Sequence, residues 1–223
     1  MGGKGKILSK YNSVDDHKPA AIDLFCGCGG LTTGLKKAGF RVIGAIDIDP
    51  LSVATYKANH PEVNTWEADI RDLDPLELID GLGLKKKGLD LIAGCPPCQG
   101  FSSMRTLNGA LKIKDPRNDL IFEFLRFIEA LRPRAVMMEN VPGLMADIRF
   151  KTFCGKLGEM GYIGEWRILN AADYGVPQRR RRLIYLAGLG FKIPLAEPAA
   201  RGGKAPAQVS SFGEPCRDPG GCV

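Results

Sequence analysis

The chain has 223 residues, 44% of them hydrophobic, and carries a formal net charge of +6 at neutral pH. That length can bury a core of its own, and that charge permits a polyanionic partner without requiring one. No run of about eighteen apolar residues is present, which argues against a membrane protein. Seven cysteines, an odd number, and a polar N-terminus without an apolar segment predict a cytoplasmic protein with reduced thiols.

Short apolar runs alternate with helical patterns along most of the chain. We expect strands in 20–27, 41–49, 89–96, 134–141, 165–171 and 181–189, with another just before Asp69. We expect helices in 31–39, 50–60, 117–131 and 150–161. One face of the 117–131 helix should be buried, because apolar residues recur there every three or four positions: Leu120, Phe124, Phe127 and Leu131. The alternation predicts an α/β fold, a mostly parallel sheet with helices on both faces.

Composition divides the chain into three segments. Residues 1–19 are polar and should form a flexible N-terminal segment. Residues 20–189 hold all the periodic patterns and form the predicted folded domain. Residues 190–223 are rich in proline and glycine, so we expect a tail that is disordered or ordered only against a partner.

The first predicted strand runs into a glycine-rich loop, "DLFCGCGGLTTGL". Gly27 and Gly29 would let the backbone approach a ligand closely. Asp47 follows about twenty residues later, where a carboxylate can hold the ribose hydroxyls of a nucleoside. Asp69 ends the next strand and could accept a hydrogen bond from an exocyclic amine. Alternatively, the glycines form a plain tight turn and the aspartates cap helices.

The stretch "GCPPCQGFSS" places Cys98 after two prolines at the end of an apolar strand. A redox pair with Cys95 is disfavoured because a loop composition follows, rather than a helix. A metal site is not expected, here or at Cys26 and Cys28, because partner ligands of suitable spacing are missing. A rigid turn would explain the prolines, whereas a thiolate nucleophile held on a stiff backbone explains Cys98 as well.

Two later stretches offer partners for such a nucleophile. In "MMENVPGL", Glu139 ends an apolar strand, so desolvation should raise its pKa and suit it to donate a proton near neutral pH. The alternative is a glutamate that caps the following turn. The densest positive charge is "QRRRR", Gln178 to Arg182, which is either a solvated basic turn or a binding site for phosphates.

Four blocks, "DLFCGCGG", "GCPPCQGFS", "ENVPGL" and "YGVPQRRRRLIYLA", resemble in order and separation those of the DNA (cytosine-5) methyltransferases. The resemblance covers Ala21 to Leu189. It implies a Rossmann-like methyltransferase fold, with 20–189 as the catalytic domain, S-adenosyl-L-methionine as cofactor and double-stranded DNA as partner. A bacterial cytoplasm or nucleoid and a restriction-modification role would fit such an enzyme.

The resemblance also implies roles for individual residues. The S-adenosyl-L-methionine site would comprise Phe25, Gly27, Gly29, Asp47, Asp69, Ile70 and Leu120. Cys98 would attack carbon 6 of a cytosine flipped out of the duplex, and Glu139 would protonate its ring nitrogen 3. Arg182 would reach the base carbonyl oxygen, and Arg180 would position the catalytic loop or a phosphate. Further substrate contacts would come from Pro97, Gln99, Ser102 and Gln178, and the segment between Cys98 and Asp119 resembles a mobile catalytic loop.

The resemblance stops after Leu189, where family members continue into a target-recognition domain and further C-terminal blocks. Either a second polypeptide supplies that half, or the chain is a truncated form. Three other functions stay open at this point. They are an RNA (tRNA) cytosine-5 methyltransferase, a catalytically silent subunit with the same fold, and a nicotinamide-dependent oxidoreductase, which the glycine loop alone would suggest.

Overall fold

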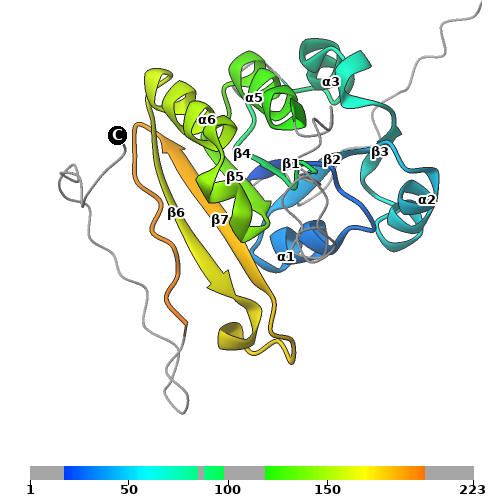
Figure 1. Cartoon of the computed structure of the whole chain (residues 1–223). Coiled ribbons are helices and arrows are strands. Elements are labelled where there is room, and N and C mark those ends of the chain that lie inside the picture. Colours follow the sequence, from blue (N-terminus) through cyan, green and yellow to red (C-terminus); the bar gives the residue numbers. More distant parts are fainter. Residues whose placement is uncertain (1–17, 85–87, 98–118, 199–223) are drawn as a thin grey trace, which may run out of the picture.

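A computed structural model describes residues 18–84, 88–97 and 119–198 of the chain. Its centre is a seven-stranded sheet in the order β3-β2-β1-β4-β5-β7-β6 (Figure 1). The parallel part consists of β1 (Ala20–Leu24), β2 (Arg41–Asp47), β3 (Asn64–Glu67), β4 (Leu91–Gly94) and β5 (Ala135–Asn140). The strand β7 (Arg181–Leu189) pairs antiparallel with both β5 and β6 (Tyr162–Asn170). The predicted α/β class is therefore confirmed.

Helices cover both faces of the sheet. Figure 1 shows α3 (Pro75–Gly81), α5 (Leu120–Leu131) and α6 (Ile148–Glu159) on one side. On the other side lie α1 (Gly30–Lys37) and α2 (Pro50–Asn59). Short 3-10 turns complete the described elements: η1 (Ile70–Asp72), η4 (Pro142–Ala146) and η5 (Ala171–Tyr174).

The two faces have separate hydrophobic cores. On β2, Ile43 and Ile46 belong to the core beneath α3, α5 and α6, whereas Val42 and Ala45 belong to the core beneath α1 and α2. Neighbouring side chains alternate between the faces, and an irregularity in the pairing of β1 with β2, where Ala21 pairs with Val42 but Ile22 with Gly44, lets residues three apart share a face. The four residues expected on the buried face of the 117–131 helix are all buried: Leu120, Phe124, Phe127 and Leu131. The sheet is thus fixed from both sides, and the carboxyl ends of its parallel strands are held at one edge.

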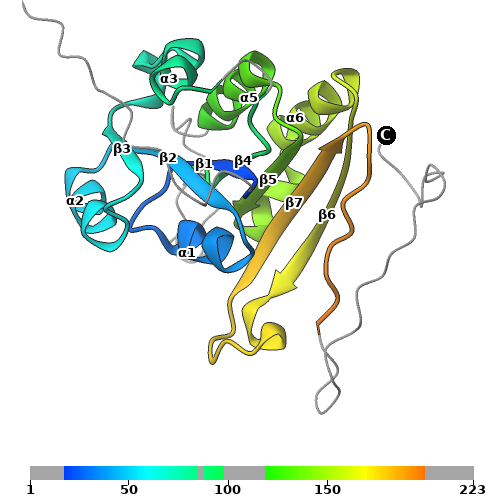
Figure 2. The same cartoon turned by 180° about the vertical axis from the view of Figure 1, so that it is seen from behind.

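The chain beyond β7 continues along β6 as far as residue 198 (Figure 2). Lys192 forms an ion pair with Glu165 at 3.0 Å, and the hydroxyl of Tyr174 donates to the carbonyl of Ala196 at 2.8 Å. The side chain of Leu195 is buried. The first residues of the predicted tail therefore pack on the domain. The remainder, 199–223, lies outside the described residues, and the predicted boundary after Leu189 stays a prediction.

The sequence predicts neither a membrane-spanning helix nor a metal site. No helix in the described part of the chain is long and apolar enough to cross a membrane. Among those same residues, no three His, Cys, Asp or Glu side chains gather in a way that could hold a metal ion.

Candidate functional site

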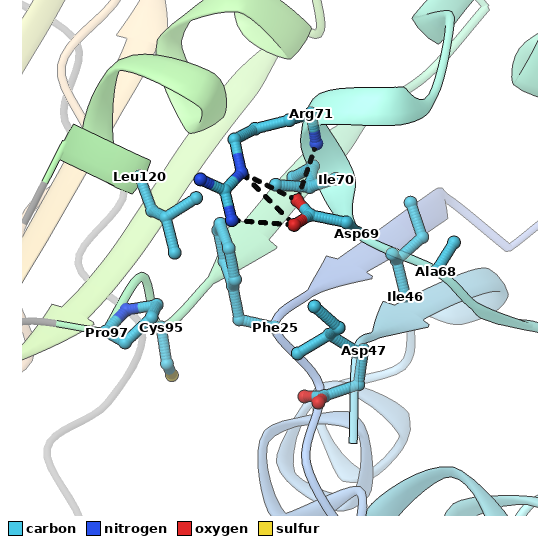
Figure 3. Close-up of a pocket in the computed structure, with 11 residues that line it drawn as sticks. Phe25, Ile46, Asp47, Ala68, Asp69, Ile70, Arg71, Cys95, Pro97 and Leu120 are labelled. Atoms are coloured by element: carbon cyan, nitrogen blue, oxygen red, sulfur yellow. Dashed lines mark hydrogen bonds and ion pairs between the residues drawn. The ribbon is translucent and has the colours of Figure 1, made fainter. Parts of the chain in front are cut away.

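A pocket of about 300 Å³ opens at the carboxyl ends of β1, β2, β3 and β4 (Figure 3). Six residues singled out from the sequence line it: Phe25, Asp47, Asp69, Ile70, Pro97 and Leu120. These side chains come from five separate stretches of the chain and meet because parallel strands end at one edge of the sheet. The wall is mostly apolar with two carboxylates, a combination suited to the flat base and the hydroxyls of a nucleoside.

The glycine loop between β1 and α1 forms a tight turn beside this pocket. Gly27 and Gly29 adopt positive φ angles of 51° and 92°, and Phe25 shares that region at 60° although it carries a side chain. The amide of Gly27 donates to the carboxylate of Asp47 at 2.8 Å, which ties the loop to the end of β2. Neither glycine is among the lining residues. They shape the turn that presents Phe25, as the tight-turn interpretation predicted, and their part in binding a ligand stays a prediction.

The second acidic residue is engaged by a neighbour that the sequence did not single out. Both carboxylate oxygens of Asp69 accept hydrogen bonds from the guanidinium of Arg71, the shortest at 2.7 Å (Figure 3). These bonds lower the pKa of Asp69, so it stays ionised. Asp69 also accepts from the amide of Arg71 and thereby caps η1, as the capping alternative predicted. A base amine at Asp69 would share the carboxylate with Arg71.

The turn after Asp69 is held from the helical layer above it. Arg126 on α5 donates to the carbonyl oxygens of Ile70 at 2.7 Å and Leu73 at 3.0 Å. These long-range bonds fix Ile70 against the pocket, next to Leu120 at the start of the same helix. Three other lining residues, Ile46, Ile48 and Ala68, escaped sequence analysis because they are apolar neighbours of the predicted residues. Cys95, considered from the sequence only as a redox partner of Cys98, also lines the pocket.

A second pocket, of about 250 Å³, lies at the ends of β5, β6 and β7. Its lining brings together the predicted Glu139, Arg180 and Arg182, and adds Leu169, Ala171, Tyr174 and Ile184. One carboxylate oxygen of Glu139 lies 2.9 Å from Nε of Arg182 and 3.6 Å from a terminal nitrogen of Arg180. The sequence suggested apolar surroundings for this glutamate, and the pocket combines apolar side chains, Leu169, Ala171 and Ile184, with two ion pairs. Two guanidinium groups face it because β7 inserts beside β5.

A buried amide links this second pocket to the segment that leads to Cys98. The side-chain nitrogen of Asn140 donates to the carbonyl of Pro96 at 2.8 Å, and its oxygen accepts from the amide of Val141 at 2.9 Å. Asn140 is only 5% exposed, so both polar atoms of its amide depend on these partners. The sequence gave it no weight beyond its place after Glu139. It fixes the prolines that precede Cys98 relative to the strand that carries Glu139.

Several predicted residues are not placed in either pocket. Cys98, Gln99 and Ser102 lie outside the described residues, and so does the loop up to residue 118. Gln178 is exposed and lines neither pocket, while its backbone amide bonds to the carbonyl of Val176 at 2.7 Å. The roles of these four residues stay predictions.

Two other thiols near the pockets are held in their neutral form. Burial raises the pKa of Cys95, and the nearby carboxylate of Glu139 adds to the effect. Burial also raises the pKa of Cys26. A neutral thiol is a poor nucleophile, so neither cysteine competes for a nucleophilic role.

The comparisons with known proteins agree with the geometry. The family model for C-5 cytosine-specific DNA methylases matches residues 20–198. The chain is 40% identical over 192 residues to the type II methyltransferase M.XorII of Xanthomonas oryzae pv. oryzae, covering 82% of this chain and 44% of that protein. It is 32% identical over 207 residues to the type II methyltransferase M.AquIA of a Picosynechococcus species, covering 86% of this chain and 82% of that protein.

Solved structures give the same result. A protein described as a DNA modification methyltransferase encoded within an Escherichia coli prophage superposes with a TM-score of 0.67 at 30% identity, over 77% of this chain and 47% of that one. The chain spans about half the length of several curated relatives that it matches. The fold is the Rossmann-like fold of these methyltransferases. With the family model matching most of its length, the chain belongs to the C-5 cytosine-specific DNA methylase family.

Proposed function

We propose that this chain is the catalytic half of an enzyme that transfers a methyl group from S-adenosyl-L-methionine to carbon 5 of cytosine in double-stranded DNA. One observation carries the proposal. Pro97 lines the pocket at the ends of β1 to β4, while Pro96 is bonded to Asn140, next to Glu139 of the second pocket. We therefore expect the residue that follows, Cys98, between the first pocket, which suits a nucleoside, and the carboxyl group of Glu139.

The first pocket fits the proposed cofactor by its chemistry. Phe25 and Leu120 give it apolar walls for an adenine ring, and the carboxylates of Asp47 and Asp69 can accept hydrogen bonds from ribose hydroxyls and an amine. Bound there, S-adenosyl-L-methionine supplies an electrophilic methyl group on a sulfonium. The chain's own contribution is to hold the nucleoside part through residues fixed by the sheet edge and by Arg126.

The second pocket would take the flipped cytosine. The thiolate of Cys98 forms a bond to carbon 6, while Glu139 delivers a proton to ring nitrogen 3 and accepts a hydrogen bond from the exocyclic amine. Electrons displaced by the thiolate reach carbon 5, which then bonds to the methyl group. Loss of the carbon 5 proton returns the electron pair to the ring and expels Cys98. Arg182 holds the carboxylate of Glu139 in position and, in this proposal, also reaches the base carbonyl oxygen.

Target recognition is a separate part of the proposal. Because the chain spans about half the length of several relatives, we propose that residues outside it, on a second polypeptide or on the part that a truncated form lacks, choose the DNA sequence. The exposed arginines around Arg180 would then contact phosphates without reading bases. Co-purification of the full chain with a second polypeptide would test this partner.

The activity is tested by transfer of tritiated methyl from S-adenosyl-L-methionine to mixed-sequence duplex DNA, with Cys98→Ser as the matched control. We expect incorporation by the wild-type chain, alone or with its partner, and none by the variant. A duplex with 5-fluorocytosine should trap a covalent adduct, because fluorine cannot leave as a proton does. Transfer to tRNA but not to DNA would favour the RNA methyltransferase, and a wild-type chain that forms no adduct would favour the silent subunit.

A further inference from the structure

His60 lies at the end of α2 and contacts the glycine loop of the first pocket from behind. It is one of four buried polar or charged residues in the described part of the chain, with 6% of its surface exposed. Its Nε2 lies 3.1 Å from the carbonyl oxygen of Gly29, and its Nδ1 lies 2.8 Å from the ammonium nitrogen of Lys36 on α1. Both ring nitrogens therefore have partners, and each partner has a fixed hydrogen-bonding role.

Those roles determine where the imidazole carries its hydrogen. A lysine ammonium can only donate, so Nδ1 of His60 must accept from Lys36 and carry no hydrogen. A carbonyl can only accept, so Nε2 must carry the hydrogen that is donated to Gly29. The arrangement is satisfied by one form of the ring, the neutral Nε2–H tautomer. Glu62 forms an ion pair with the same ammonium, which holds Lys36 in place for this contact.

The contact acts on the part of the loop that presents Phe25. Gly29 has a φ of 92°, and its amide donates to the carbonyl of Cys26 at 3.0 Å, which closes the turn that follows Phe25. A side chain at Gly29 would collide with the ring, because a Cβ there would lie 2.4 Å from Nε2 of His60. The ring of Tyr56 supports His60 from the same helix, with 4.8 Å between centroids. The imidazole is thus packed directly beneath the turn.

We propose that His60 is a positioning residue for the cofactor loop, residues 25–29, and that it holds this loop only while the imidazole is neutral. The inference rests on the proposed binding of S-adenosyl-L-methionine and assigns a residue that supports it without touching the cofactor. Protonation would put a hydrogen on Nδ1 directly against the Lys36 ammonium, with no acceptor between them. The two cations would separate, and Gly29 would lose its brace.

Among the residues that the structure describes, three titratable side chains face His60 or its lysine partner. They are Lys36 from α1, Glu62 after α2, and the phenol of Tyr56, whose ring contacts the imidazole. Behind Tyr56, its hydroxyl lies 2.7 Å from the hydroxyl of Thr32, which donates to the buried carboxylate of Asp23. Burial raises the pKa of Asp23 to about 7, so a test must separate its effect from that of His60.

The tautomer is measured by ¹⁵N NMR on the full chain labelled at histidine. The sequence contains only two histidines, and a His17→Gln variant leaves the signals of His60 alone. We expect the Nε2–H tautomer at about pH 8, where an ordinary imidazole is neutral. A hydrogen on Nδ1 at that pH would overturn the proposal, whether or not the chain binds a cofactor.

Binding of S-adenosyl-L-methionine is then measured by calorimetry at about pH 8 and about pH 5.5, on either side of the ordinary imidazole pKa. A glutamine at position 60 can place an amide N–H where Nε2 lies and cannot be protonated. We expect the dissociation constant of the wild-type chain to rise on acidification more than that of His60→Gln. Both proteins keep Asp23, so the difference between their profiles belongs to His60. Identical profiles would overturn the proposal.

Two further variants separate positioning from packing. His60→Asn keeps an acceptor near Nδ1 but does not reach Gly29, and His60→Leu fills the space without hydrogen bonds. Both should bind about tenfold more weakly than His60→Gln at about pH 8, the usual effect of one buried hydrogen bond. Lys36→Met should also weaken the brace, whereas Lys37→Met, at an exposed site on the same helix, serves as its control.

The outcomes distinguish the inference from the function on which it rests. A wild-type chain that binds no S-adenosyl-L-methionine at either pH would overturn the proposed function and, with it, the cofactor role of His60. A wild-type chain that binds it as tightly as the folded His60→Leu and His60→Asn variants do would overturn the inference alone.

Discussion

The two pockets differ in how their acidic residues are held. In the parallel half of the sheet, Asp47 accepts hydrogen bonds from the backbone amides of Gly27 and Asp49, so main-chain geometry fixes it. In the antiparallel half, Glu139 is held by the side chains of Arg180 and Arg182. Backbone N–H donors stay beside the carboxylate as long as the chain is folded, whereas an arginine side chain can change its conformation and bind a DNA phosphate or a base instead. The first pocket is therefore suited to a constant ligand, and the second can rearrange when substrate enters.

The largest expected effect separates chemistry in one half from binding in the other. Glu139→Gln removes the proton donor and should lower kcat by about 10²- to 10⁴-fold, the range of general acid catalysis. It should leave the dissociation constant of S-adenosyl-L-methionine unchanged. Asp47→Asn is the matched carboxylate-to-amide change in the other half and should do the reverse, weakening cofactor binding with little effect on kcat at saturation. Steady-state kinetics measures kcat, and calorimetry measures the dissociation constant. If the two variants changed kcat equally and the dissociation constant equally, the two pockets would not divide chemistry from cofactor binding.

The next effect concerns stability and arises in the parallel half alone. Asp23 is buried on β1, and desolvation raises its pKa to about 7 from an ordinary value of 3.8. The folded state therefore holds this proton more tightly than the unfolded state. Below about pH 4 both states are protonated, and as the pH rises toward 7 this group progressively reduces the free energy of unfolding. Above about pH 7, where both states are ionised, the loss is complete.

Asp23→Asn tests that account, because an amide cannot ionise and can still accept the hydrogen bond from Thr32. At about pH 8 the variant should be more stable than the wild-type chain by on the order of 2–4 kcal/mol, since each pKa unit corresponds to about 1.4 kcal/mol. Near pH 4 that difference should vanish. Urea unfolding at a series of pH values measures it, with the exposed Asp80→Asn as control. A wild-type chain more stable than the variant at pH 8 would contradict the argument.

Sequence patterns predicted the parallel half more completely than the antiparallel half. Strand ends, glycine spacing and acidic residues place Asp47 and Asp69 at one edge, because every parallel strand ends on the same side of the sheet, and the family resemblance adds Phe25. The pairing of Glu139 with Arg182 depends instead on β7 inserting between β5 and β6, which no local pattern encodes. The same holds for His60 and Asn140. Each donates one long-range hydrogen bond to a backbone carbonyl. Such a contact cannot be predicted from the spacing of apolar and polar residues in the sequence.

Asn140 gives a smaller, paired prediction. Asn140→Ala strips the buried carbonyl of Pro96 and the amide of Val141 of their partners and should cost about 1–3 kcal/mol of stability. Because Pro96 lies two residues before the proposed nucleophile, kcat should fall as well.

The matched control is Asn64→Ala in the parallel half. It removes an exposed amide that donates to the carbonyl of Ile43 at 3.2 Å, and should cost less than about 1 kcal/mol of stability. Thermal unfolding and methyl transfer measure the two effects, and a variant with unchanged kcat would show that Asn140 stabilises the fold without positioning Cys98.

The smallest effect distinguishes the two arginines around Glu139. Arg182 contacts the carboxylate at 2.9 Å with its side chain 25% exposed, whereas Arg180 approaches at 3.6 Å and is 48% exposed. Water screens the second pair more strongly, so Arg180→Lys should change stability by less than about 1 kcal/mol. Because lysine keeps the positive charge, the salt dependence of DNA binding should change little in Arg180→Lys, whereas Arg180→Gln should weaken it, since the half-exposed guanidinium can contact a phosphate. Arg182→Lys loses the Nε contact and should lower kcat more than Arg180→Lys does. If the two variants lowered kcat equally, both arginines would hold Glu139 throughout the reaction, and the antiparallel pocket would be as rigid as the parallel one.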